Sequence, residues 1–168
     1  LHPFIRNTVG CMEFGGCFLN DRLDKSNARG TIRRTTDVFQ LATCVLFQNP
    51  IQNFAITPNN LEDAPAVCLD FLREVPTTWD EVKFIDGYPG KYVVLARRHG
   101  EKCYVAAVNA GKETLKLNAD LSFLGEKVVS WYADDKNLQP QMQEKKLKAG
   151  KPTQLVIAPQ GGIVLVTE

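Results

Sequence analysis

Few side chains in this 168-residue sequence are of the types that carry out nucleophilic or metal chemistry. There are two histidines, His2 and His99, so a Ser-His-Asp triad or a histidine-rich metal site has few candidates. The five cysteines are widely spaced and form no Cys-X-X-Cys pair, which disfavours a zinc site. Cys44 and Cys68 fall on the apolar faces of helix-like stretches, and we interpret them as small buried hydrophobic residues.

Carboxylates and aromatic rings offer two other chemistries, metal binding and stacking on sugars. The run Asp134-Asp135-Lys136-Asn137 supplies oxygen ligands but lacks the spacing and the distal glutamate of a calcium loop, so a hairpin turn is favoured. Trp79, Trp131 and Tyr132 could present a flat platform to a sugar ring. Trp131 lies in an apolar strand, which favours a core position. Trp79 follows Pro76, where packing at a boundary between two halves of the chain is favoured.

Composition and charge exclude several classes of protein. Apolar residues make up 44% and charged residues 23% of the chain, which is typical of a soluble globular protein. The balance of 20 basic and 19 acidic residues argues against a nucleic-acid or acidic-lipid partner recruited by bulk charge. No apolar run approaches the length of a membrane span. The chain starts at Leu1 without a signal-peptide pattern, and we expect either a processed N-terminus or a piece of a longer polypeptide.

The elements that must position these residues fall into two halves, and in residues 1–74 the hydrophobic period is helical. One predicted helix, capped by Thr36 or Asp37, has an apolar face formed by Val38, Leu41, Ala42, Val45 and Leu46. A second helix is predicted over 62–74, with Asp63 as its N-cap. Short strands are predicted over 8–14 and 51–56. The order strand, helix, strand, helix is typical of two β/α units, and because parallel strands need neighbours, we expect the end of a larger α/β domain.

Residues 75–168 show short strands separated by tight turns, and no convincing helix. The run Tyr88-Pro89-Gly90-Lys91 has proline and glycine at the positions that a type II turn requires. The predicted strands span 82–86, 92–97, 103–109, 114–121, 128–132, 155–158 and 163–167. This pattern predicts an antiparallel β-sandwich over 75–168.

Several long runs resemble one enzyme family. TWDEVKFIDGYPGKYVVLARRHGEKCYVAAVNA at 78–110 is similar to the start of the C-terminal domain of glycoside hydrolase family 97. PFIRNTVGCMEFGG at 3–16 resembles a late segment of that family's catalytic barrel, and RTTDVFQLATCVLFQNPIQNFAITP at 34–58 and FLREVPTTWD at 71–80 continue the resemblance in order. Together these runs cover nearly the whole chain.

The resemblance implies an architecture and a cofactor. Family members are expected to have an N-terminal β-sandwich, a (β/α)8 barrel and a C-terminal β-sandwich. Residues 1–74 would then be the last two β/α units of the barrel, and 75–168 the C-terminal β-sandwich. Calcium is the implied cofactor, with its ligands and the general acid on earlier strands, so we assign no catalytic and no metal-binding residue within this chain. Export to the periplasm, or elsewhere outside the cytoplasm, is implied in the same way.

Glycoside hydrolysis uses two carboxyl groups that flank the scissile bond, and barrels carry such groups at the C-terminal ends of their strands. The carboxylates expected there are Glu13, Asp21 and Asp24. Glu13 is our candidate for contacting sugar hydroxyls, although relatives often have M-D-Y-T-P where this chain has M-E-F-G-G, and a structural role stays open. Asn59 and Asn60 follow the second predicted strand and could bind sugar hydroxyls or simply form a turn or helix cap.

Two kinds of function are consistent with these observations. In the first, the chain belongs to an exo-acting glycosidase that removes terminal α-linked glucose from starch-like oligosaccharides, together with a missing N-terminal portion of the same polypeptide. An α-galactosidase is a variant of this hypothesis. In the second, the chain is a non-catalytic β-sandwich module that binds glycan or supports a partner. Neither hypothesis involves nucleic acid or a membrane.

Overall fold

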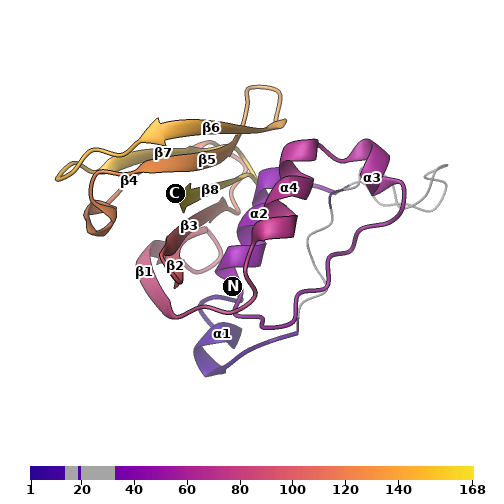
Figure 1. Cartoon of the computed structure of the whole chain (residues 1–168), viewed down its shortest axis with the longest axis horizontal. Helices are drawn as coiled ribbons and strands as arrows, with labels where there is room; N and C mark the ends of the chain where they lie inside the picture. The colour runs from indigo at the N-terminus through magenta and orange to yellow at the C-terminus, as the bar shows by residue number, and fades with distance from the viewer. Residues whose placement is uncertain (14–18, 20–32) are drawn as a thin grey trace.

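The computed structural model describes residues 1–13, 19 and 33–168, and its helices lie in the first half of the chain (Figure 1). The described helices are α1 (Arg6–Val9), α2 (Asp37–Leu46), α3 (Asn60–Asp63) and α4 (Ala66–Glu74), with a short 3-10 helix at Ser122–Leu124. The described strands are β1 (Glu81–Tyr88), β2 (Tyr92–His99), β3 (Lys102–Asn109), β4 (Leu115–Ala119), β5 (Val128–Asp134), β6 (Pro140–Lys146), β7 (Thr153–Ile157) and β8 (Gly162–Thr167).

These strands form two antiparallel sheets. Six strands pair in the order β1-β2-β3-β8-β5-β6, and β4 pairs with β7 in a second, smaller sheet. The large sheet is apolar on both faces. In β2, Val93 and Leu95 belong to one buried cluster while Val94 and Ala96 belong to another. Because successive side chains of a strand point to opposite faces, this sheet must be covered on both sides.

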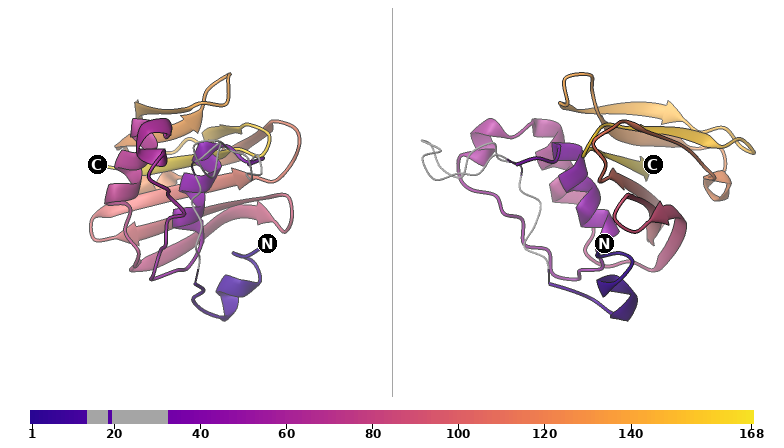
Figure 2. Two further views of the ribbon diagram at one scale, coloured as in Figure 1. Left: turned by 90° about the vertical axis from the view of Figure 1, so that its right-hand side faces the viewer. Right: turned by 180° about the vertical axis from the view of Figure 1, so that it is seen from behind.

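Different layers cover the two faces. The second cluster joins the large sheet to β4 and β7, through Leu155 and Ile157 of β7 among others. The first cluster joins it to α2 and α4, which lie along the other face (Figure 2). The fold is therefore a β-sandwich with a layer of helices added on the outer face of its larger sheet.

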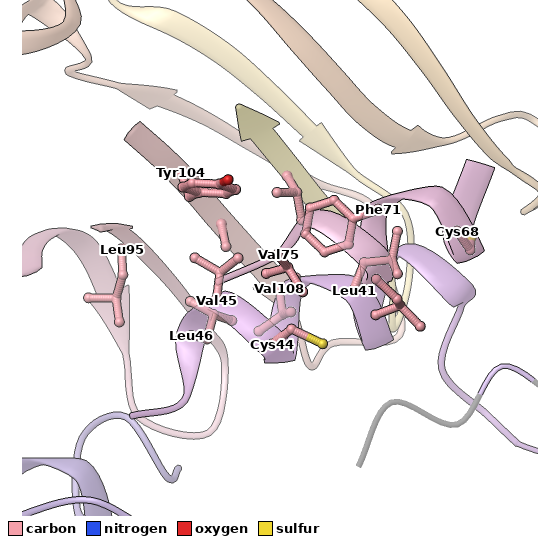
Figure 3. Close-up of a cluster of buried hydrophobic side chains, with 14 of the residues drawn as sticks. Leu41, Cys44, Val45, Leu46, Cys68, Phe71, Val75, Leu95, Tyr104 and Val108 are labelled. Carbon is pink, nitrogen blue, oxygen red and sulfur yellow. The ribbon is translucent and has the colours of Figure 1, made fainter. Parts of the chain in front are cut away.

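The helices of the first half and the sheet of the second half share one core (Figure 3). Leu41 and Val45 of α2 are fully buried, and their cluster includes Leu95, Tyr104 and Val108 of the sheet. Burying one such aliphatic side chain contributes about 1.5–3 kcal/mol. The contact between helix and sheet is thus a major source of stability for the chain as it stands.

The two predicted helices differ in how well they match the structure. The buried face of α2 is confirmed, and the Thr36 hydroxyl caps it by accepting a hydrogen bond of 3.1 Å from the backbone N–H of Phe39. The second helix is divided into α3 and α4, and Asp63 is the last residue of α3 rather than an N-cap. Proline disfavours a helical conformation of the residue before it, and Ala64 is accordingly extended before Pro65.

The strands predicted in the first half are wrong. Residues 8–14 begin inside α1 and continue without sheet pairing as far as Glu13, and 51–56 holds only an isolated bridge at Gln52. A parallel strand is stabilised by neighbouring strands on both edges, and the described residues provide none beside either segment. One backbone hydrogen bond, from Met12 N–H to the Gln48 carbonyl at 2.9 Å, ties the first segment to the chain that follows α2. The two barrel units are therefore not formed by the described residues.

The strands predicted in the second half are found, with an additional one. The turn between β1 and β2 has Gly90 at φ 78° and a hydrogen bond of 2.9 Å from Lys91 N–H to the Tyr88 carbonyl, as a type II turn requires. Strand β6 is not among the predicted strands. Its sequence, PQMQEKK, is polar and largely exposed because it forms an edge of the large sheet and pairs with β5 alone.

Candidate functional site

The predicted sugar-binding residues do not form one described cluster. Glu13 is exposed and lies in an irregular segment, whereas Asn59 and Asn60 are buried at the start of α3. Within the described part of the chain, no hydrogen bond or ion pair joins Glu13 to either asparagine. Asp21 and Asp24 lie outside the described residues.

Both asparagines hold the turn that precedes α3. The side-chain oxygen of Asn60 accepts a hydrogen bond of 2.9 Å from the backbone N–H of Thr57. The Thr57 hydroxyl donates to the side-chain oxygen of Asn59 at 3.0 Å. This geometry matches the turn or cap role that the sequence left open, and sugar binding by Asn59 stays a prediction.

Polar contacts join the start of α2 to the sheet. Asp134, at the end of β5, accepts hydrogen bonds from the Thr36 hydroxyl at 2.9 Å and from the Gly162 N–H at 3.3 Å. Burial raises the pKa of Asp134 to about 6, and these two hydrogen bonds act in the opposite direction. The predicted hairpin turn is confirmed: Lys136 and Asn137 form the turn after β5, and the Asp135 carboxylate accepts from the N–H groups of Asn137 and Gln139.

Gly162 allows α2 to approach the sheet this closely, because a Cβ atom on it would lie 2.6 Å from the Val38 carbonyl oxygen and 2.8 Å from the Phe39 Cα. A Cβ atom on Gly161 would lie 2.6 Å from the Asp134 carboxylate, which accepts the hydrogen bond from Thr36. The sequence marks Gly161-Gly162 as a turn, but Gly162 also makes room for the helix.

A pocket of about 270 Å³ lies where the N-terminal segment, the chain after α2 and the first two strands meet. Its lining includes Cys11, Asn49, Trp79, Asp80 and Arg97. Arg97 is only 5% exposed and donates a hydrogen bond of 3.3 Å to the carbonyl of Leu46, the last residue of α2. A cation at the C-terminal end of a helix is electrostatically favourable.

The two tryptophans do not form a common sugar platform. Trp79 packs against the helix-side cluster, with its ring 5.2 Å from that of Tyr104, as expected of a residue at the boundary between the halves. Trp131 is 7% exposed and belongs to the cluster on the opposite face of the sheet, which confirms its core position. The buried positions predicted for Cys44 and Cys68 are likewise confirmed.

Among the described residues, no group of three or more histidine, cysteine, aspartate or glutamate side chains is arranged to hold a metal ion. The resemblance places the calcium ligands on earlier strands of the barrel, and calcium stays a prediction. No described helix is long and apolar enough to cross a membrane.

Comparison with known families decides the identity of this fold. Residues 78–168, more than half of the chain, match the family model described as "Glycosyl-hydrolase 97 C-terminal, oligomerisation". The chain belongs to glycoside hydrolase family 97. The match begins just before β1 and includes both sheets but none of the α-helices, so the β-sandwich matches the family's C-terminal domain.

Individual relatives, some with solved structures, are similar to the first half of the chain as well. The chain is 64% identical to a crystal structure of a beta-arabinopyranosidase, with a TM-score of 0.94 over 99% of this chain and 26% of that one. It is 25% identical to a family 97 enzyme from Pseudoalteromonas sp. strain K8 in complex with panose, with a TM-score of 0.79 over 99% of this chain and 28% of that one. It is 31% identical to the retaining alpha-galactosidase of Bacteroides thetaiotaomicron over 97% of this chain.

The family 97 relatives are much longer than this chain. It spans 26% of the Bacteroides alpha-galactosidase and 16% of a probable retaining alpha-galactosidase from Streptomyces bingchenggensis, to which it is 36% identical over 110 residues. The activities of those proteins belong to longer polypeptides, and this chain matches only a part of each.

Proposed function

We propose that this chain is the C-terminal part of an exo-acting family 97 glycosidase, in which it packs against a catalytic portion that carries the acid and the base or nucleophile. The observation that carries this proposal is the 64% identity to a beta-arabinopyranosidase over 99% of the chain. The carboxylates support it, because Glu13 is exposed and Asp134 is occupied in joining α2 to the sheet. A glycosidase needs two carboxyl groups that flank the scissile bond, and the two carboxylates that line the pocket of about 270 Å³, those of Asp80 and Glu81, are both paired with Arg98.

The proposed substrate carries a terminal galactose-like or arabinopyranose sugar. A β-L-arabinopyranoside has the ring configuration of an α-D-galactoside and lacks only its hydroxymethyl group. With arabinose as the L sugar and galactose as the D sugar, the names of the beta-arabinopyranosidase and of the two alpha-galactosidases correspond to one stereochemistry. The similarity of this chain to these proteins favours that stereochemistry over the glucose configuration.

A second candidate is the hydrolysis of α-linked glucose from oligosaccharides. It is favoured by the Pseudoalteromonas family 97 structures, which hold panose and acarbose. Their identity to this chain is 25%, well below that of the beta-arabinopyranosidase, so this candidate ranks second. Calcium as a cofactor of the longer enzyme and its export from the cytoplasm are proposals that rest on the family resemblance.

The substrate proposal is tested with a polypeptide that includes the region preceding residue 1. Initial rates are measured on p-nitrophenyl β-L-arabinopyranoside, α-D-galactoside and α-D-glucoside. We expect kcat/KM for one of the first two to exceed that for the glucoside by at least about tenfold. The reverse order supports the second candidate. Glycan binding without hydrolysis of any of the three supports the non-catalytic module and overturns both.

A further inference from the structure

We propose that the pocket around Arg97 and Trp79 binds a carboxylate. Arg97 lies on β2 on the same face as Val93 and Leu95, which is the face that α2 covers. The Arg97 side chain is almost removed from water, since the residue is only 5% exposed. Buried charges in proteins are paired or bound to a ligand because an unpaired charge in such a place is costly.

The described contacts of Arg97 leave its positive charge without a counterion. Nη2 donates to the Leu46 carbonyl, and the guanidinium carbon lies 5.9 Å from the centre of the Trp79 ring. Nε is buried and has no hydrogen-bond partner among the described residues. Burial lowers the pKa of Arg97, and the nearby Cys11 acts in the opposite direction.

The two carboxylates that line the pocket are engaged with another arginine. Asp80 and Glu81 pair with Arg98 at 3.4 Å and 2.9 Å. Asp80 also accepts a hydrogen bond of 2.8 Å from the backbone N–H of Gly100. Since Arg97 and Arg98 are consecutive residues of one strand, their side chains point to opposite faces of the sheet. Asp80 and Glu81 therefore do not neutralise Arg97.

Trp79 adds a second unused donor next to Arg97. Its indole Nε1–H is buried and has no partner within the described part of the chain. An indole nitrogen can only donate, and a guanidinium offers a fork of donors and no acceptor. Two such groups on one pocket call for an acceptor that carries negative charge, and a carboxylate fits the geometry of the guanidinium.

This carboxylate has two possible sources. One is an aspartate or glutamate side chain from the longer polypeptide that the family 97 relatives imply. The other is a free small carboxylate, for which a pocket of about 270 Å³ has room. The chemistry of recognition is the same in both cases, and the experiment below separates them.

The test uses acetate on the 168-residue chain, with acetamide as the neutral molecule of the same shape. The chain has two tryptophans, so its amide NMR spectrum has two indole N–H signals, and Trp79→Phe identifies that of Trp79. We expect acetate to shift the Trp79 signal saturably, with a Kd on the order of 1–10 mM. Acetamide should leave that signal in place, and the Trp131 signal should not respond to either.

Arg97→Gln and Arg73→Gln form a matched pair, because both remove one arginine charge and Arg73 is exposed on α4, where it pairs with Asp70 and does not line the pocket. Arg97→Gln should abolish the acetate response and Arg73→Gln should retain it. Loss of the response in both variants, or in neither, overturns the proposal, as does a wild-type chain that responds equally to acetate and acetamide. If Arg97→Gln does not fold, the contrast between acetate and acetamide on the wild-type chain and on Arg73→Gln decides.

The source of the carboxylate is found by calorimetry on the longer polypeptide. If acetate raises its Tm and acetamide does not, the ligand is a free carboxylate. If acetate has no effect while Arg97→Gln lowers the Tm and Arg73→Gln does not, the polypeptide supplies the group itself. If neither acetate nor Arg97→Gln changes the Tm, the proposal is overturned. None of these readouts depends on hydrolytic activity, so the proposal can fail while the proposed function stands.

Discussion

The Thr36 hydroxyl at the start of α2 donates a hydrogen bond of 2.9 Å to the carboxylate of Asp134, which lies at the end of β5 and 98 residues further along the chain. The same hydroxyl accepts from the N–H of Phe39, so one side chain both caps the helix and attaches it to the sheet. Removing such a cap typically costs about 1 kcal/mol. This pair links the helical half of the chain to the β-sandwich.

Asp134 should make stability depend on pH. Burial raises its pKa to about 6, so the folded chain keeps a proton on this carboxyl at pH values where the unfolded chain has lost it. The stabilisation is fully present below about pH 4 and is lost as the pH rises through about 6. Asp134→Asn keeps an oxygen acceptor and removes the titration. At about pH 7.5 we expect its free energy of unfolding to exceed that of the wild type by about 2–3 kcal/mol, with little difference at about pH 4.

This prediction is checked by urea unfolding of both proteins at the two pH values. The other titrating groups contribute equally to both proteins, so their contributions cancel when the two free energies of unfolding are subtracted. A difference that is the same at both pH values would show that Asp134 does not titrate as described.

Gly162→Ala should be strongly destabilising. The new methyl group would collide with backbone atoms of Val38 and Phe39, which cannot move aside without displacing α2. We expect a loss of about 2–3 kcal/mol, measured as a lower urea midpoint. Gly10→Ala is the matched control because no atom lies within 4 Å of its added Cβ, and it should change stability by less than about 0.5 kcal/mol. Equal effects of the two substitutions would refute the close approach of α2.

The parts of the fold that the sequence predicts are those fixed by local pattern. The buried face of α2, the turn at Gly90 and the apolar strands of the β-sandwich all follow from periodicity or from residues that a turn requires. The strands expected near Thr8 and Ile51 are not formed, because strand pairing depends on neighbouring strands that the described residues do not provide. Strand β6 is polar because it is an exposed edge, and its sequence therefore carries little strand signal.

The functional positions that sequence reasoning missed depend on contacts distant in the chain. Arg97 is a charged residue in a strand, and nothing in its neighbours shows that it is buried and bonded to Leu46, 51 residues earlier. Asp134 falls in a run of turn-forming residues, and its role appears only when β5 and α2 are brought together. The sequence does carry one sign of the role of Asp134, because this carboxylate ends a strand that is otherwise uncharged.

Leu41→Ala should destabilise the β-sandwich as well as the helices, because Leu41 is fully buried in the core that they share. We expect a loss of about 2–5 kcal/mol and one unfolding transition in urea, monitored by tryptophan fluorescence. Arg73→Ala on the exposed side of α4 is the control and should have little effect, since its ion pair with Asp70 is open to solvent. A sandwich transition that stays at the wild-type midpoint in Leu41→Ala would show that the two halves unfold independently.

Asn60→Ala and Glu13→Gln should separate structure from substrate contact. Asn60→Ala leaves the Thr57 N–H without its acceptor, and we expect a loss of stability of about 1 kcal/mol.

Glu13 is exposed, so Glu13→Gln should leave stability within about 0.5 kcal/mol of the wild type. If Glu13 contacts sugar hydroxyls, its variant in the longer enzyme should raise KM more than it lowers kcat. A loss of kcat of about a thousandfold would instead make Glu13 part of the catalytic machinery.

We propose that this family 97 chain supplies a packing domain while the catalytic carboxyl groups lie elsewhere in the enzyme. The deciding measurement is the rate of p-nitrophenol release by the purified 168-residue chain on the β-L-arabinopyranoside, α-D-galactoside and α-D-glucoside. We expect rates equal to those of a protein-free blank on all three. Turnover of any of them that follows the protein through purification and is lost in Glu13→Gln would place a catalytic carboxyl group in this chain.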